Sequence, residues 1–140
     1  MDAPVHDLTL IANYAFLDAE FSEGEHEGNT TPFAPEFTFA VGVDYMHDFL
    51  GGTLNWFAMY NYTDNIYHDI ENNFEEPSYG LLNGRVSYTP QSESWELAFA
   101  ADNITDEDYA VTRIDFGIGT GEQAMFGSPR LMRAEFNIWF

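Results

Sequence analysis

The chain has 140 residues, enough for one domain with a core, and it contains no cysteine, which excludes disulfides and thiolate metal sites. Its 24 acidic residues stand against four arginines and no lysine. The resulting net charge of -20 disfavours nucleic acid or an anionic lipid surface as a partner. Aromatic residues make up 17% of the chain, a share typical of side chains at membrane interfaces.

Apolar residues alternate with polar or small residues in six stretches, which predicts six β-strands. In chain order the stretches are residues 8–16, 37–45, 54–62, 82–88, 95–101 and 131–140. Helical spacing fits none of them as well, and glycine, asparagine and threonine are too frequent for helix interiors. The last stretch has about the ten residues that a tilted strand needs to cross a bilayer, and it ends on an aromatic residue, Phe140.

Long and short connections alternate strictly between these stretches. The long ones are residues 20–36, 63–79 and 105–130, and the short ones are residues 46–52 and 89–94. Outer-membrane β-barrels show this pattern, with short periplasmic turns and long extracellular loops. The parity places Phe140 on the periplasmic side.

Aromatic residues gather near both ends of the predicted strands, as in a sheet that crosses a membrane. Tyr45, Trp56, Tyr88, Trp95 and Trp139 lie near short connections, and Phe16, Phe37, Tyr60, Tyr62 and Tyr79 lie near long ones. The predicted fold is therefore all-β, an antiparallel meander of about six transmembrane strands. Six strands do not close a membrane barrel, so we expect them to be part of a larger outer-membrane β-barrel.

Two observations qualify this prediction. Residues 1–20 lack the basic and apolar segments of a signal peptide, and no run of about 18 apolar residues predicts a transmembrane helix. An outer-membrane protein carries a signal peptide, so we expect the front of the protein to be missing from this sequence. The alternative is a soluble β-sandwich that binds carbohydrate through exposed aromatic residues.

Several segments resemble the penultimate strands of TonB-dependent outer-membrane receptors. They are residues 82–90 (LNGRVSYTP), 95–98 (WELA) and 102–109 (DNITDEDY), against the family's usual GRVSY, W-L-A and N-L-T-D-x-x-Y. Gly127-Ser128-Pro129-Arg130, followed by a strand that ends in Phe140, is similar to the start of the family's final strand. Residues 13–21 and 35–45 resemble earlier strands.

The resemblance implies a barrel of about 22 strands with an amino-terminal plug, driven by the TonB complex of the inner membrane. Residues 1–140 would form about the last quarter of it, the carboxy-terminal segment of the barrel, with the plug domain and earlier strands absent. The implied function is uptake of a scarce nutrient, such as an iron–siderophore complex, across the outer membrane of a Gram-negative bacterium. The implied partners are outer-membrane lipid, the TonB complex through the missing plug, the barrel assembly machinery and the nutrient ligand. Phe136, Ile138 and Phe140 resemble the carboxy-terminal signal that the assembly machinery reads.

Candidate site residues follow from position. Aromatic residues of the long connections are expected to contact ligand, namely Tyr79, Tyr109, Phe116 and Phe126. On the polar faces, Arg130 and Arg133 are expected to offset carboxylates such as Asp102 and Glu135 inside the barrel. Asn103 and Thr105 are expected to bond local backbone groups where a strand ends.

No catalytic, metal or cofactor site is predicted. The four histidines are scattered without ligand spacing, and no nucleophile–base pair stands out. The Gly-rich residues 117–121 are not followed by a strand–helix frame, so they are expected to be a flexible loop rather than a phosphate cradle.

Overall fold

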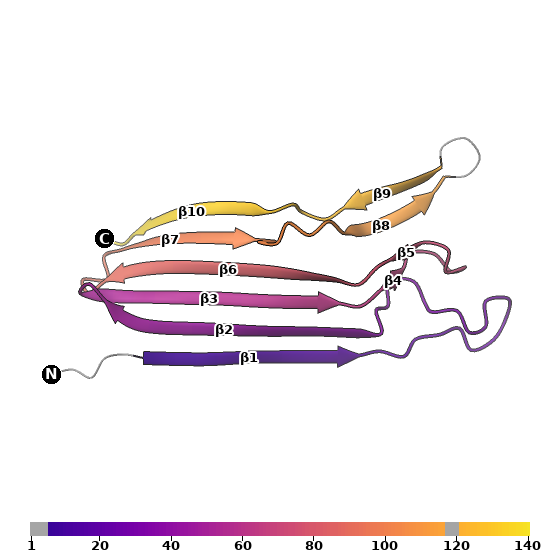
Figure 1. Ribbon diagram of the computed structural model, residues 1–140, viewed down its shortest axis with the longest axis horizontal. Helices are drawn as coiled ribbons and strands as arrows, with labels where there is room; N and C mark the ends of the chain where they lie inside the picture. Colours follow the sequence, from indigo (N-terminus) through magenta and orange to yellow (C-terminus); the bar gives the residue numbers. More distant parts are fainter. Residues whose placement is uncertain (1–5, 117–120) are drawn as a thin grey trace.

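Six long strands form one antiparallel sheet in the computed structural model, which describes residues 6–116 and 121–140 (Figure 1). They are β1 (His6–Phe16), β2 (Phe37–Phe49), β3 (Gly52–Thr63), β6 (Tyr79–Pro90), β7 (Trp95–Asp102) and β10 (Leu131–Ile138). Their order in the sheet is β1-β2-β3-β6-β7-β10. Each strand therefore lies beside the next one along the chain, and the predicted meander of six strands is confirmed.

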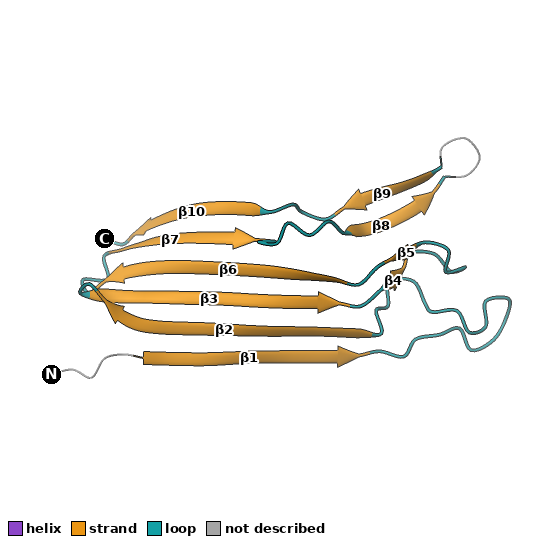
Figure 2. Cartoon of the chain, viewed as in Figure 1, coloured by secondary structure: helices purple, strands orange, loops and turns teal. Residues whose placement is uncertain are grey.

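Two short hairpins lie outside this sheet. β4 (Ile66–Tyr67) pairs with β5 (Glu75–Glu76), and β8 (Ala110–Asp115) pairs with β9 (Glu122–Phe126). Strands and loops make up all of the described chain (Figure 2). None of the described residues forms a helix of the length and apolar character that would cross a membrane.

The connections are sorted by length between the two ends of the sheet (Figure 1). Residues 50–51 and 91–94 form the turns at one end, where the carboxy-terminus also lies. At the other end are loop A (residues 17–36), loop B (residues 64–78, with β4 and β5) and loop C (residues 103–130, with β8 and β9). The predicted alternation is confirmed, and it places Phe140 at the short-turn end.

The first turn is tighter than the sequence predicted. Only Leu50 and Gly51 lie between β2 and β3, and both have positive φ values, 47° and 73°. Two such residues suit a two-residue hairpin turn whose twist matches its strands. The strands therefore pair out to Phe49 and Gly52, beyond the alternating stretches.

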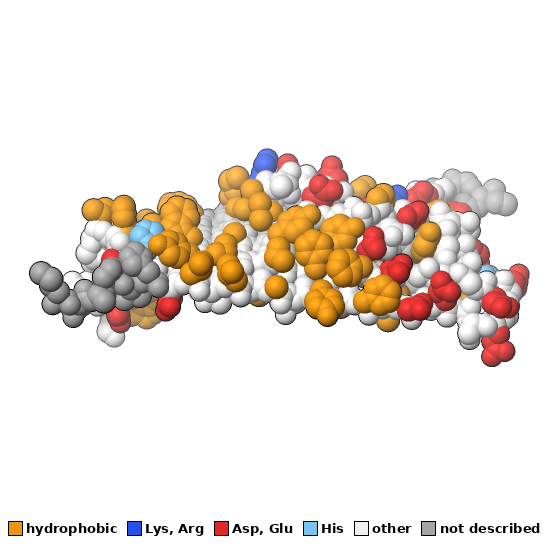
Figure 3. Space-filling model, turned by 60° about the horizontal axis from the view of Figure 1, so that its bottom comes forward, with side chains coloured by type: hydrophobic (Ala, Val, Ile, Leu, Met, Phe, Trp, Pro, Cys, Tyr) orange, Lys and Arg blue, Asp and Glu red, His pale blue; other side chains and the backbone are white. Residues whose placement is uncertain are grey.

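The apolar residues of all six predicted strands lie on the same face of the sheet. One row across the strands is Leu10, Val43, Ala58, Gly84, Ala101 and Met132. The adjacent row, on the opposite face, is Thr9, Asp44, Phe57, Arg85, Ala100 and Arg133. We call these the apolar face and the polar face. Figure 3 shows hydrophobic side chains over the strands and acidic ones concentrated at the long-loop end.

This sheet has almost no core. The buried hydrophobic residues of the described chain are Ala98, Ala100 and Ala110, whereas Leu10 and Tyr14 of the apolar face are 75% and 81% exposed. A water-soluble sandwich would pack a second sheet on that face, because exposed apolar area of this extent is unfavourable in water. The structure has a single layer, so the β-sandwich alternative is wrong.

Aromatic side chains cluster at both ends of the apolar face, as predicted. At the long-loop end the rings of Phe39 and Tyr62 stack with centroids 5.0 Å apart. At the short-turn end the rings of Tyr88 and Trp95 lie 5.7 Å apart. The pairs mark the two edges of an apolar band, the arrangement found where strands meet the two membrane interfaces.

The last strand ends earlier than its alternation predicted. β10 stops at Ile138, which pairs with Trp95, the first residue of β7. Trp139 adds one hydrogen bond from its N–H to the carbonyl of Ser94, at 2.9 Å. Phe140 has no strand beside it in the described chain, because the neighbouring chain at residues 91–94 turns from β7 toward β6. Phe140 therefore lies fully exposed outside β10.

Candidate functional site: the long loops and the polar face

Loops A and B are held together by backbone and amide hydrogen bonds. The Asn72 side chain accepts from the Thr30 N–H at 2.8 Å and donates to the Thr30 carbonyl at 2.9 Å. Beside it, Asn29 Nδ2 donates to the Ile70 carbonyl at 2.9 Å. Paired amide bonds of this kind fix the two loops in register.

Phe33 of loop A is the second contact between these loops. Its N–H donates to the carbonyl of Tyr67 at 2.9 Å, and its ring lies 5.1 Å from that of His68. Its φ of 59° is unfavourable for a bulky side chain. The contacts to loop B offset that cost. They also place loop A against His68, the side chain that contacts loop C.

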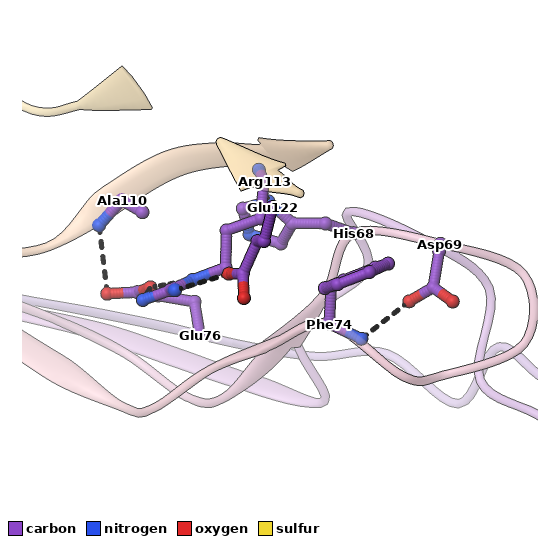
Figure 4. Close-up of polar contacts among 7 residues, drawn as sticks. All are labelled: His68, Asp69, Phe74, Glu76, Ala110, Arg113 and Glu122. Atoms are coloured by element: carbon purple, nitrogen blue, oxygen red, sulfur yellow. Dashed lines mark hydrogen bonds and ion pairs between the residues drawn. The ribbon is translucent and has the colours of Figure 1, made fainter. Parts of the chain in front are cut away.

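Loops B and C are joined by an ion pair between a buried carboxylate, Glu76, and a partly buried arginine, Arg113 (Figure 4). Glu76 is 4% exposed. Its Oε2 accepts from Nε and Nη2 of Arg113 at 2.9 and 2.8 Å, and its Oε1 accepts from the Ala110 N–H at 2.8 Å. Arg113 also donates to Glu122 at 2.8 Å. Hydrogen bonds to Glu122 and Glu76 raise the pKa of Arg113 further above its usual range, so the guanidinium is always charged.

His68 is part of the same contact. Its Nδ1 accepts a hydrogen bond of 2.6 Å from the backbone N–H of Arg113. Its Nε2 is buried and has no hydrogen-bond partner among the described residues. Burial lowers the pKa of His68, an effect that the charge of Glu76 partly opposes. The group therefore favours the neutral form at neutral pH.

The structure brings together two of the four residues predicted to contact ligand. Tyr79, the first residue of β6, stacks on Tyr109 with ring centroids 4.5 Å apart. The Tyr109 ring lies directly against Gly127, where a Cβ atom would overlap it. Phe116 and Phe126 lie on the β8–β9 hairpin instead, each 63% exposed. Ligand contact by these four residues stays a prediction.

Asn103 closes the end of β7, as the sequence predicted. It is 4% exposed and has a φ of 49°. Its Oδ1 accepts from the Glu107 N–H at 2.9 Å, and its Nδ2 donates to the carbonyls of Glu107 and Ser128 at 2.9 and 3.2 Å. One side chain thus joins the beginning of loop C to its end. Thr105 makes no comparable side-chain bond within the described part of the chain.

The polar face carries a chain of ion pairs across β6, β7 and β10. Arg85 contacts Glu96 at 2.6 Å and Glu135 at 3.6 Å. Arg133 contacts Glu135 at 3.6 Å and is paired with Asp102. The prediction for Arg133 is confirmed, and each of these side chains has a partner of opposite charge, as charges on the inner wall of a barrel require.

Arg130 does not belong to this chain of ion pairs, so that part of the prediction is wrong. It precedes β10 and therefore lies in loop C, where its guanidinium is 3.3 Å from Asp106. Its N–H donates to the same carboxylate at 3.0 Å. Of the predicted Gly-rich loop, residues 117–120 lie outside the described part of the structure. The described residues contain no group of three or more side chains placed to hold a metal ion.

Comparisons with known proteins agree with this geometry. The profile of the family described as "TonB dependent receptor-like, beta-barrel" matches residues 3–104. The chain is also similar to the crystal structure of the ferric yersiniabactin uptake receptor FyuA from Yersinia pestis, with a TM-score of 0.85 and 20% identity over 95% of this chain and 21% of that one. It is similar to BauA, the ferric preacinetobactin receptor from Acinetobacter baumannii, with a TM-score of 0.72 and 22% identity over 92% of this chain and 19% of that one. The chain thus spans about one fifth of either solved receptor, and at these identities the likeness establishes the fold.

Proposed function

Because the chain belongs to the TonB-dependent receptor β-barrel family, we propose that it forms wall and loops of a receptor that takes up a scarce nutrient through the outer membrane of a Gram-negative bacterium. The nutrient we propose is an iron–siderophore complex. Energy would come from the TonB complex of the inner membrane, acting through a plug domain. The role is transport, with no catalytic step.

The observation that carries this proposal is the one-sided sheet. Its apolar face carries exposed apolar side chains on β1, β2, β3, β7 and β10 and half-buried ones on β6, whereas its polar face holds the paired charges of Arg85, Glu96 and Glu135. Lipid stabilises the first face and a water-filled or plugged lumen stabilises the second. Loops A, B and C gather at one end, where we place the entrance for the ligand.

The two edges of the sheet support a place within a larger barrel. Among the described residues, β1 pairs only with β2, and β10 pairs only with β7. In a membrane an unpaired edge is costly, because each unsatisfied backbone group there costs several kcal/mol. We propose that the chain is the carboxy-terminal segment of the barrel, with further strands and the plug supplied by the rest of the protein. Phe136, Ile138 and Phe140 would then be read by the barrel assembly machinery.

The charge of the loops narrows the proposed ligand class. Most acidic residues of the chain lie in loops A, B and C, whose only cations are Arg113 and Arg130. Both arginines are paired with carboxylates of the loops themselves. A negative field slows the approach of anions and favours neutral or cationic ligands. The proposed complex is therefore one without net negative charge.

Uptake of radioactive iron by cells that carry this receptor as their only one tests the proposal. We expect a neutral hydroxamate complex to be taken up, a strongly anionic catecholate complex to be taken up poorly, and uptake to stop when TonB is removed. Phe116→Ala and Phe126→Ala should reduce uptake, whereas Phe49→Ala, an exposed aromatic residue at the short-turn end, should not. Uptake that continues without TonB would contradict the proposal.

A further inference from the structure

We propose that His68, Glu76 and Arg113 form a pH-sensitive latch that holds the β8–β9 hairpin against the β4–β5 hairpin, and that acidification releases it. The hydrogen bond from the Arg113 N–H to His68 Nδ1 is the titrating part of the latch. The ion pair between Arg113 and Glu76 is its second part.

The bond to Arg113 fixes the protonation state of His68. A backbone N–H can only donate, so Nδ1 must present its lone pair, and the proton of the neutral ring lies on Nε2. Nε2 is buried without an acceptor among the described residues, so the closed latch gains nothing from that proton. A second proton on Nδ1 would face the N–H of Arg113, donor against donor. The closed latch therefore requires neutral His68.

The charges around His68 come from loop B, which includes β5, and from the β8–β9 hairpin of loop C. Asp69 follows it in loop B, Glu76 lies on β5, and Arg113 lies on β8 with its partner Glu122 on β9. The uncharged ring of Phe33 from loop A also lies beside His68. Three hydrogen bonds from Arg113 and the Ala110 N–H already occupy most of the acceptor sites of Glu76. A cationic His68 would compete with Arg113 for that carboxylate and repel its guanidinium, so protonation weakens both parts of the latch.

The hairpin has a second attachment near its base, made by a backbone hydrogen bond and a stack of two rings. The Gly127 N–H donates to the Tyr109 carbonyl at 2.8 Å, and Tyr109 stacks on Tyr79. Breaking the latch therefore frees the part of the hairpin beyond this stack. That part would pivot at Tyr109 and Gly127, where the hairpin stays attached. If the loops cover the ligand entrance, which rests on the proposed function, acid opens the side of that entrance formed by loop C.

The direction of the pH dependence follows from the lowered pKa of His68. In the open state the ring is expected to titrate near the ordinary histidine pKa of about 6.5. In the closed state His68 takes up its second proton only at lower pH. Between the pKa of the closed state and that of the open state, the open state therefore binds more protons. The latch is at full strength above about pH 6.5 and weakens as the pH falls below that.

A distance measurement tests this in the membrane-inserted receptor and needs no ligand. Cysteines placed at the exposed positions Asn73 and Gln123 carry spin labels on the two hairpins, and this chain has no cysteine of its own. Between about pH 8 and about pH 5 we expect the label distance to lengthen and its distribution to broaden, with a midpoint below about pH 6.5. A distance unchanged by pH would overturn the proposal, whether or not the receptor transports iron.

Two variants and a control assign the effect to His68. His68→Gln keeps a side-chain acceptor without a titrating group, so the short distance should persist at both pH values. His68→Phe removes the acceptor, so the long distance should appear at both. His26→Gln, a loop A histidine outside the latch, should respond to pH as the unmodified protein does. A pH response that survives in His68→Gln, or one that is lost in His26→Gln, would overturn the latch.

Discussion

Replacing Glu76 with alanine should open the loop B–loop C contact far more than its single carboxylate suggests. The substitution removes three hydrogen bonds, two from Arg113 and one from Ala110, and leaves a buried N–H without a partner. Breaking a buried ion pair by removing one member costs about 3–5 kcal/mol. Arg113 is only partly buried and keeps Glu122, so we expect about 2–4 kcal/mol for local opening, roughly a hundredfold in the opening equilibrium.

Hydrogen exchange at the backbone N–H of Arg113 measures that opening, because its own acceptor, His68, is untouched by the substitution. The matched control is Glu122→Ala, which removes the other carboxylate from the same guanidinium. The Glu122 side chain is 43% exposed, against 6% for Glu76, so its loss should cost less than about 1 kcal/mol. Equal effects of the two substitutions would refute the reasoning, since burial would then not decide the strength of the contact.

Three further predictions concern the sheet and loop C. Ala58→Arg on the apolar face should destabilise the membrane-inserted protein by about 2–4 kcal/mol in urea unfolding, whereas Ala40→Arg on the polar face should cost far less; equal costs would contradict the assigned faces. Asn103→Ala should lose about 1–3 kcal/mol of local stability and speed proteolysis of loop C, with Asn103→Asp intermediate because it keeps the acceptor; unchanged cleavage of the alanine variant would argue against the junction. Gly127→Ala should displace the Tyr109 ring and shorten the lifetime of the β8–β9 attachment in hydrogen exchange, an expectation that unchanged exchange would exclude.

The strands and their faces were predictable because the relevant signal is local. Alternation over seven or more residues identifies a strand here, and short turns fix which strands pair. Cross-strand neighbours such as Val43 and Ala58 can then be predicted without knowledge of distant contacts. Turn lengths were less predictable, because Met46 and His47 break the alternation although they lie within β2.

The latch could not be predicted from the sequence, for a physical reason. His68 and Arg113 are 45 residues apart, and Glu76 and Arg113 are 37 apart. Their contact depends on the placement of two hairpins whose strands are too short to show a period. A weak signal was present in the β8–β9 hairpin, since residues 110–115 and 122–126 flank a Gly-rich stretch, which is a hairpin pattern. Nothing in the local sequence marks His68 as different from His26.

The near absence of a core has a consequence for how this sequence can vary. In a soluble protein each interior side chain is constrained by the shape of its neighbours. In the proposed receptor Leu10, Met132 and the other residues of the apolar face would contact fluid lipid in place of fixed atoms, so their polarity would be constrained and their shape hardly at all. Substitutions among apolar residues should accumulate freely on that face, while positions such as Asn103, Glu76 and Gly127 tolerate few. In this fold, the loop positions that hold the loops together should tolerate fewer substitutions than the positions on the apolar face of the strands.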